Sequence, residues 1–118
     1  MAGVTTHVLD VTIGRPVQGV RVELYELGSG SERKLLADMV TNADGRTDKP
    51  LLAADEARAG RFELIFHAGD YFHRRAAELA EPPFLDVVPI RFGLADPKAH
   101  YHVPLLVSPW SYSTYRGS

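Results

Sequence analysis

The sequence predicts an all-β sandwich, and three observations support this. Several segments alternate between apolar and polar residues with period two, which is typical of strands that bury one face. Short turn signals, such as Gly14-Arg15-Pro16 and Asn42-Ala43-Asp44-Gly45, separate these segments. The chain has 118 residues, 45% of them hydrophobic and 24% charged, which is enough to bury a core. We therefore expect one domain over residues 1–118.

The strands follow from the alternation. It is clearest in Val20–Tyr25, Phe62–Phe66 and Val88–Leu94, where every second residue is apolar. Val4–Asp10 and Lys34–Thr41 alternate more weakly and are further candidates. Short strands at this spacing, divided by turns, favour a sandwich over a helical or mixed fold.

One helix is predicted between the strands. Asp70 is the candidate N-cap, Arg74–Ala80 is rich in helix formers, and Pro82-Pro83 would end the helix. A further short helical turn is a candidate in Ala53–Ala59, where Gly60 would end it.

The composition argues against several classes of function. A net charge of −2 offers no basic surface for nucleic acid. The chain has no cysteine, which removes disulfides, thiolate nucleophiles and cysteine-bound zinc. No secretory signal precedes His7, and no apolar run approaches the roughly 20 residues that cross a bilayer. We therefore expect a cytoplasmic protein that engages neither nucleic acid nor membrane.

The most informative strand is Ala99–Val107. One face carries Tyr101, Val103, Leu105 and Val107, which are apolar enough to form the core; the other carries His100, His102, Pro104 and Leu106. Pro104 has no N–H group, which predicts a free edge or a bulge there. Taken alone, the strand favours two surface histidines. Its spacing singles out no further ligand, so no metal site is predicted.

Three other features remain ambiguous when each is taken alone. His7 stands beside apolar residues on both faces of its strand, and Arg46 directly follows the Asp44-Gly45 turn. The segment Ser108–Ser118 is rich in aromatic and hydroxyl residues to its end, whereas the last residues of a chain are usually poorly ordered and lack such side chains. Either a closing strand or a terminus that lines a site would explain it.

Taken together, these segments resemble the transthyretin family over essentially the whole chain. His7-Val8-Leu9-Asp10 followed by Gly14-Arg15-Pro16 is similar to its N-terminal signature, and His100–Pro109 with Ser111–Thr114 resembles its C-terminal signature. The closing Tyr115-Arg116-Gly117-Ser118 is similar to the tetrapeptide of the family's 5-hydroxyisourate hydrolases.

The resemblance implies a two-sheet antiparallel sandwich of about eight strands with one short helix. It also implies a homotetramer, in which edge-to-edge dimers meet around a central channel. The face that bears His102, Pro104 and Leu106 is neither as apolar as a core face nor as polar as a solvent-exposed face, which would suit a channel wall.

The resemblance also implies a site. His7, Arg46, His102 and Ser118 match catalytic positions of the hydrolases; His7, Arg46 and Tyr115 match positions that hold substrate. His100 is a candidate for a supporting role, whereas His67 and His73 match no motif of the family.

The implied reaction is hydrolysis of 5-hydroxyisourate to 2-oxo-4-hydroxy-4-carboxy-5-ureidoimidazoline in urate degradation, without metal or cofactor. Either His7 or His102 would activate water, because an imidazole titrates near neutral pH, and Arg46 would stabilise the oxyanion. Direct attack by water is expected, since no Gly-x-Ser-x-Gly elbow is present. The alternative is a transthyretin-like carrier that binds a small aromatic ligand in the channel.

Overall fold

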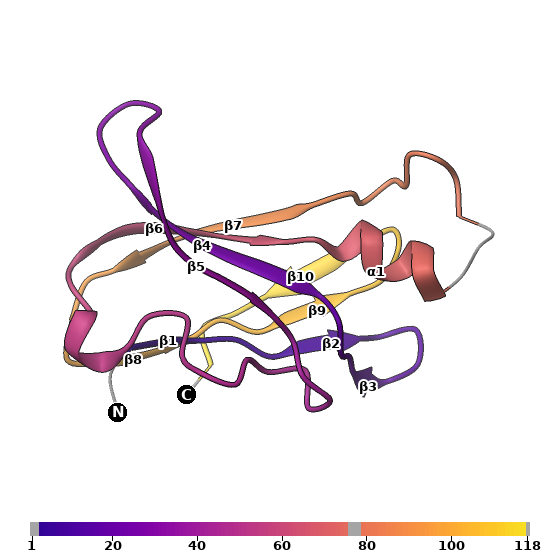
Figure 1. Ribbon diagram of the computed structural model, residues 1–118, viewed down its shortest axis with the longest axis horizontal. Helices are drawn as coiled ribbons and strands as arrows, with labels where there is room; N and C mark the ends of the chain where they lie inside the picture. The colour runs from indigo at the N-terminus through magenta and orange to yellow at the C-terminus, as the bar shows by residue number, and fades with distance from the viewer. Residues whose placement is uncertain (1–2, 76–78, 118) are drawn as a thin grey trace.

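The computed structural model describes residues 3–75 and 79–117, and Figure 1 shows two layers of strands with one helix at an end. The first layer is a four-stranded antiparallel sheet in the order β5-β4-β6-β7. Its strands are β4 (Arg21–Leu27), β5 (Arg33–Val40), β6 (Gly60–Phe66) and β7 (Val88–Leu94). All four were predicted from the alternation of apolar residues.

The second layer contains two hydrogen-bonded groups of strands. One is the four-stranded sheet β10-β9-β2-β3 and the other is the pair β1-β8. Their bounds are β1 (Gly3–Thr5), β2 (Val8–Asp10), β3 (Arg15–Pro16), β8 (His100–His102), β9 (Leu105–Val107) and β10 (Tyr112–Thr114). The Val103 N–H donates to the Thr5 carbonyl, and the Leu105 N–H donates to the His7 carbonyl, so pairing continues across the break.

Antiparallel pairing was predicted throughout the sandwich; it holds for the first sheet and for β2–β3 and β9–β10, but it is wrong for the centre of the second layer. β1 pairs with β8, and β2 with β9, in parallel, which places Thr5 directly opposite His102. The chain therefore runs in the same direction through β1–β2 and through β8–β9. If β1–β2 and β8–β9 are each read as one interrupted strand, the sandwich has the expected eight among the described residues.

The core lies between the layers and confirms the predicted face of the last long strand. Tyr101, Val103, Leu105 and Val107 are all buried against the apolar side chains of the first sheet. Pro104 lies where the strand is interrupted, but the pairing register with β1 and β2 is the same on both sides. The irregularity is therefore a break in the strand and not a bulge. The Pro104 carbonyl accepts a hydrogen bond from the Thr114 hydroxyl.

Helix α1 (Ala68–Arg75) begins two residues before the predicted N-cap Asp70, which lies exposed in its first turn. The Gly69 N–H donates to the Asp86 carbonyl (2.7 Å), so contacts with the rest of the fold decide where the helix starts. The predicted Arg74–Ala80 segment is helical only to Arg75; residues 76–78 lie outside the described residues, and 79–80 are not helical. The candidate turn in Ala53–Ala59 is the 3₁₀ helix η1 (Ala54–Glu56).

The helix is anchored by Asp10, a fully buried carboxylate at the end of β2. The Tyr71 hydroxyl and the Arg75 guanidinium both donate to Asp10, at 3.0 and 3.1 Å. A buried charge needs such partners, since burial removes its hydration. In the part of the chain that the structure describes, no helix has the length and apolarity needed to cross a membrane.

Candidate active site

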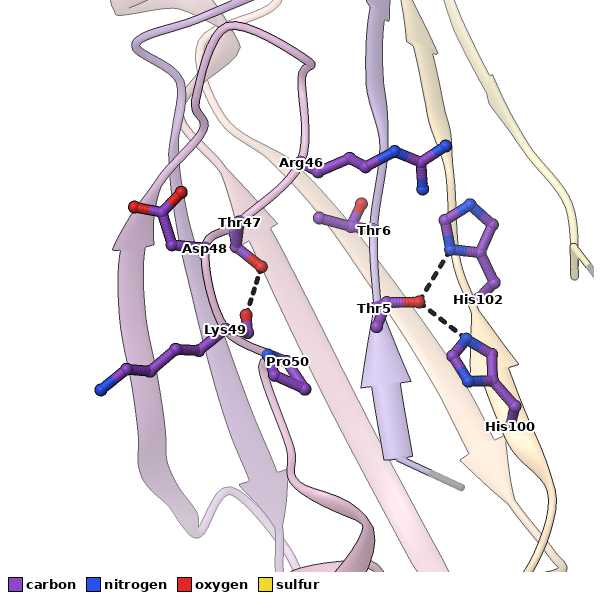
Figure 2. A pocket seen from close by; sticks show the side chains of 9 residues that line it. All are labelled: Thr5, Thr6, Arg46, Thr47, Asp48, Lys49, Pro50, His100 and His102. Carbon is purple, nitrogen blue, oxygen red and sulfur yellow. Dashed lines mark hydrogen bonds between the residues drawn. The ribbon is translucent and has the colours of Figure 1, made fainter. Parts of the chain in front are cut away.

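A cavity of about 480 Å³ opens where β1 and β8 face the segment that follows the Asp44-Gly45 turn. The side chains around it are shown in Figure 2, and the residues lining it are Thr5, Thr6, Arg46, Thr47, Asp48, Lys49, Pro50, His100 and His102. Two of the predicted catalytic residues, Arg46 and His102, and the predicted supporting residue His100 therefore share one cavity.

Strand geometry explains why the two histidines reach this cavity. Residues two apart in a strand point to the same side, so His100 and His102 both leave the core. Both side chains are half-buried, neither packed in the interior nor free in solvent. The same rule places Thr5 and His7 together on the outer face of the neighbouring strand, which resolves the ambiguity of His7.

Thr5 connects the two histidines. Its hydroxyl oxygen lies 2.8 Å from His100 Nε2 and 2.8 Å from His102 Nδ1, and Figure 2 draws both contacts. A hydroxyl has one proton to donate and two lone pairs, so it can donate to only one of the two imidazoles and must accept from at least one of them. Sequence reasoning missed Thr5, although its spacing of two from His7 was a usable signal.

Arg46 is held by a tightly bonded turn. Asn42 accepts at its side-chain oxygen from the Asp44 and Arg46 N–H groups, and its own N–H donates to the Arg46 carbonyl. Gly45 adopts a φ of 74°, and its carbonyl accepts a hydrogen bond from the Val8 N–H, which ties the turn to β2. The Arg46 guanidinium extends from this turn toward His102 (Figure 2).

His7 lies beside the same turn, although it does not line the cavity. A Cβ atom placed on Gly45 would come within 3.2 Å of His7 Cδ2, so the imidazole packs directly against the turn. The backbone of Asp44 bonds the His7 ring and, with the Asp44 charge, favours the protonated form. Burial and the Arg46 charge outweigh these effects and lower the pKa of His7.

The pKa of His102 is also lowered. Burial is the largest cause, because it removes the hydration that a charged imidazole needs. The positive charge of Arg46 and the neighbouring rings of His100 and His7 act in the same direction. Both predicted bases are therefore held in the neutral form, which is the form that can accept a proton.

Of the described C-terminal residues 115–117, Gly117 contacts this site. The Gly117 N–H donates to the His102 carbonyl (2.8 Å), and a Cβ atom at position 117 would lie only 2.6 Å from His102 Cδ2. A glycine is needed there because the backbone passes against the imidazole ring. Sequence reasoning treated Gly117 only as part of the tetrapeptide and did not single it out.

Tyr115, predicted to bind substrate, lies elsewhere in the single chain. Its side chain is 60% exposed and borders a separate depression of about 380 Å³ beside β7, with Arg116 and Phe92 among the other residues lining it. The structure therefore does not bring Tyr115 to the histidines. Ser118, predicted to be catalytic, lies outside the described residues.

The remaining histidines are paired with carboxylates away from the cavity. His67 lies 2.7 Å from Glu23 on the first sheet, and His73 on α1 pairs with Glu81. Within residues 3–75 and 79–117, no three His, Asp or Glu side chains converge as they would around a metal ion.

Residues 4–117 match the model of the HIUase/Transthyretin family. A curated relative, 5-hydroxyisourate hydrolase 2 of Rhizobium meliloti (strain 1021), is 54% identical over 114 residues. The alignment covers 97% of this chain and 94% of the relative.

Solved structures agree with this match. A 5-hydroxyisourate hydrolase from Klebsiella pneumoniae is 36% identical with a TM-score of 0.80, and each chain is fully covered. An (S)-allantoin synthase is 44% identical with a TM-score of 0.89, but this chain spans only 43% of that longer chain.

A transthyretin from Sparus aurata supports the fold alone. It is 24% identical to this chain and has a TM-score of 0.86 over 99% of this chain and 97% of its own. Since the family match extends from residue 4 to residue 117, the chain belongs to the HIUase/transthyretin family.

Proposed function

We propose that this chain hydrolyses 5-hydroxyisourate, the activity that the names of the Rhizobium meliloti and Klebsiella pneumoniae relatives give for those proteins. The observation that carries the proposal is that His102 and Arg46 line the same cavity, where burial and the Arg46 charge favour the neutral imidazole. A neutral imidazole can act as the general base for water, and a fixed cation can stabilise the oxyanion that forms when water attacks an amide in a ring.

The reaction needs an activated water and a stabilised oxyanion. His102 lines the cavity with one ring nitrogen bonded to Thr5, which leaves the other to accept a proton from water. The Arg46 guanidinium, which carries hydrogen-bond donors only, would donate to the developing oxyanion. His7, packed on the turn that holds Arg46, would orient water or substrate. Water would attack directly, with no covalent intermediate on Ser118.

The tail and the assembly complete the proposal. We infer a single domain over residues 1–118 and a homotetramer built from two dimers. The strands β7 and β10 are free edges of their sheets, and exposed aromatic side chains, Tyr112 and Tyr115, stand on or beside β10. Such edges pair readily with another chain. In the assembled protein Tyr115 would contact substrate, and we infer a catalytic role for Ser118.

A ligand carrier of the transthyretin type is the weaker candidate. A carrier for an apolar aromatic ligand gains little from three ionisable side chains at its binding site, and their desolvation costs free energy. The sequence identities point the same way, with 54% to a hydrolase and 24% to a transthyretin.

The activity can be tested with freshly generated 5-hydroxyisourate, whose ultraviolet absorbance falls as its ring opens. We expect the purified protein to accelerate the decay by orders of magnitude, since enzymes commonly reach ~10⁶-fold or more. The buffer alone and the His102→Ala variant serve as controls. Decay at the spontaneous rate with the wild-type protein would overturn the hydrolase proposal.

A further inference from the structure

The Thr5 hydroxyl touches two histidines of the site at once, at 2.8 Å from each. Thr5 is the direct register partner of His102, and the pairing of Gly3 with His100 places His100 diagonally across from Thr5. Since both contacts come from a strand pair in the sheet, the three side chains are held by backbone pairing. A threonine also has few χ1 rotamers, so its hydroxyl is well oriented.

The direction of these hydrogen bonds follows from Arg46. Figure 2 shows the guanidinium group of Arg46 extending toward the His102 nitrogen that Thr5 does not contact, with His100 on the far side. The positive charge of Arg46, which also lowers the pKa of His102, disfavours a proton on this nitrogen, Nε2. With its proton on Nδ1, His102 would donate to Thr5 Oγ1. The Thr5 hydroxyl would then donate to His100 Nε2.

We propose that Thr5 is a positioning residue that sets the tautomer of His102 and passes protons between His102 and His100. The proposal rests on the hydrolase function above and assigns the general base, since it leaves His102 Nε2 open to water. It also gives His100 a defined part in the reaction, as the second holder of the proton.

Each step of the relay balances. A water molecule gives one proton to His102 Nε2 while its oxygen bonds to the ring carbonyl carbon. The Nδ1 proton of His102 passes to Thr5 Oγ1, and the hydroxyl proton of Thr5 passes to His100 Nε2. The positive charge then resides on His100. The same transfers in reverse deliver one proton to the leaving ring nitrogen as the C–N bond breaks, and all three side chains return to their starting states.

The charges around the cavity explain why a proton transfer from His102 to His100 would be favourable. A positive charge that stayed on His102 would face Arg46 and would be poorly hydrated, which is why the pKa of His102 is lowered. Transfer through Thr5 moves this charge to the imidazole on the far side of His102 from Arg46 (Figure 2). The base can thus stay neutral before attack and still accept a proton during it.

The tautomers can be measured without substrate, by ¹⁵N NMR of the imidazole nitrogens in the intact protein near neutral pH. We expect His102 protonated on Nδ1 and His100 protonated on Nδ1 with Nε2 accepting. Thr5→Val, which keeps the shape of the side chain, should leave His102 as a mixture of tautomers. A wild-type His102 protonated on Nε2 alone would overturn the proposal, whatever the activity.

Kinetics supply the second test. Thr5→Val should lower kcat about ten- to a hundredfold, within the range of proton-transfer effects, with KM little changed. Thr5→Ser should restore most of the loss, and the wild-type rate should depend on more than one exchangeable proton in mixtures of light and heavy water. Thr12→Val, which removes a hydroxyl bonded to Asp10 and away from the histidines, is the matched control.

Two results separate the proposals. A wild-type protein with the expected tautomers but no hydrolysis would reject the proposed function while supporting the Thr5 bridge. A Thr5→Val variant that folds and keeps full kcat would reject the relay while leaving the hydrolase function intact.

Discussion

At the scale of single residues, the protonation state and the position of the His102 imidazole are determined by its neighbours. Burial and the Arg46 charge lower its pKa from the ordinary 6.5, and they act on His7 in the same way. Thr5 is hydrogen-bonded to Nδ1 of the ring, and the Gly117 backbone lies close to its Cδ2 atom. Each contact restricts either the protonation state or the position of the imidazole.

The lowered pKa values predict the acid side of the pH profile. A base whose pKa is lowered stays neutral to more acidic pH, so kcat should hold below pH 6.5 and fall only as pH drops through the lower folded value. In Arg46→Met, which removes one cause of the shift, this fall should move upward in pH and kcat should also decrease. The measurement is kcat against pH for both proteins. An acid limb above 6.5 in the wild type would contradict the argument.

The close approach of Gly117 to His102 predicts a loss of activity without unfolding. A methyl group at position 117 would lie 2.6 Å from His102 Cδ2, so the ring must move. We expect Gly117→Ala to lower kcat about tenfold or more, since displacement of a catalytic group by about 1 Å costs that much. The control Gly60→Ala adds a methyl at an exposed strand end with only ordinary contacts, and it should keep wild-type kinetics.

At the scale of elements, the turn of residues 42–46 determines where Arg46 and His7 lie. Gly45 is buried with a positive φ, and a Cβ atom there would approach the Val8 carbonyl oxygen at 2.5 Å. Gly30 has a similar φ of 66° but no atom near its absent Cβ. Substituting alanine at Gly30 therefore tests the energetic cost of the backbone conformation alone, whereas the same substitution at Gly45 adds the cost of a steric contact.

This difference predicts unequal effects on stability. Gly30→Ala should lower the free energy of unfolding by about 1 kcal/mol, the cost of a left-handed residue with a side chain. Gly45→Ala should lower it by roughly 2–4 kcal/mol, since the methyl meets backbone as well. Urea denaturation of both variants measures the two values. Equal losses would show that the contact at Gly45 is relieved by a small movement.

At the scale of the whole molecule, the single chain leaves its proposed site incomplete. Tyr115 borders a depression beside β7, while His102 and Arg46 line the cavity formed by β1, β8 and the turn. The free edges β7 and β10 lie on the same side as Tyr115 and Tyr112, where a second copy would pair. Assembly and activity should therefore be linked.

Removing the last four residues, 115–118, tests this link. Sedimentation should give four times the mass of one chain for the wild type. The shortened protein should keep this mass, because the paired strands are intact, but lose most of its hydrolysis rate. A wild-type monomer with full activity would show that one chain holds the complete site. A shortened protein with full activity would remove the tail from the mechanism.

The sequence by itself determined which faces of the strands are buried, because strand periodicity is local. The alternation in Val20–Tyr25 or Ala99–Val107 depends only on residues two apart, and it predicted the core correctly. The placement of His100 and His102 off the core followed from the same rule. The motifs that resemble the family supplied Arg46 and His7, whose own surroundings in the sequence were ambiguous.

Only the tertiary structure decided how distant segments meet. The parallel pairing of β1 with β8 brings Thr5 opposite His102, 97 residues away, and no local pattern encodes that register. The start of α1 was decided by the Gly69–Asp86 contact, which overrode the capping signal at Asp70. The approach of Gly117 to His102 and the separation of Tyr115 from it depend likewise on where the last strand packs. Such contacts depend on the packing of the two layers, which periodicity within one strand cannot specify.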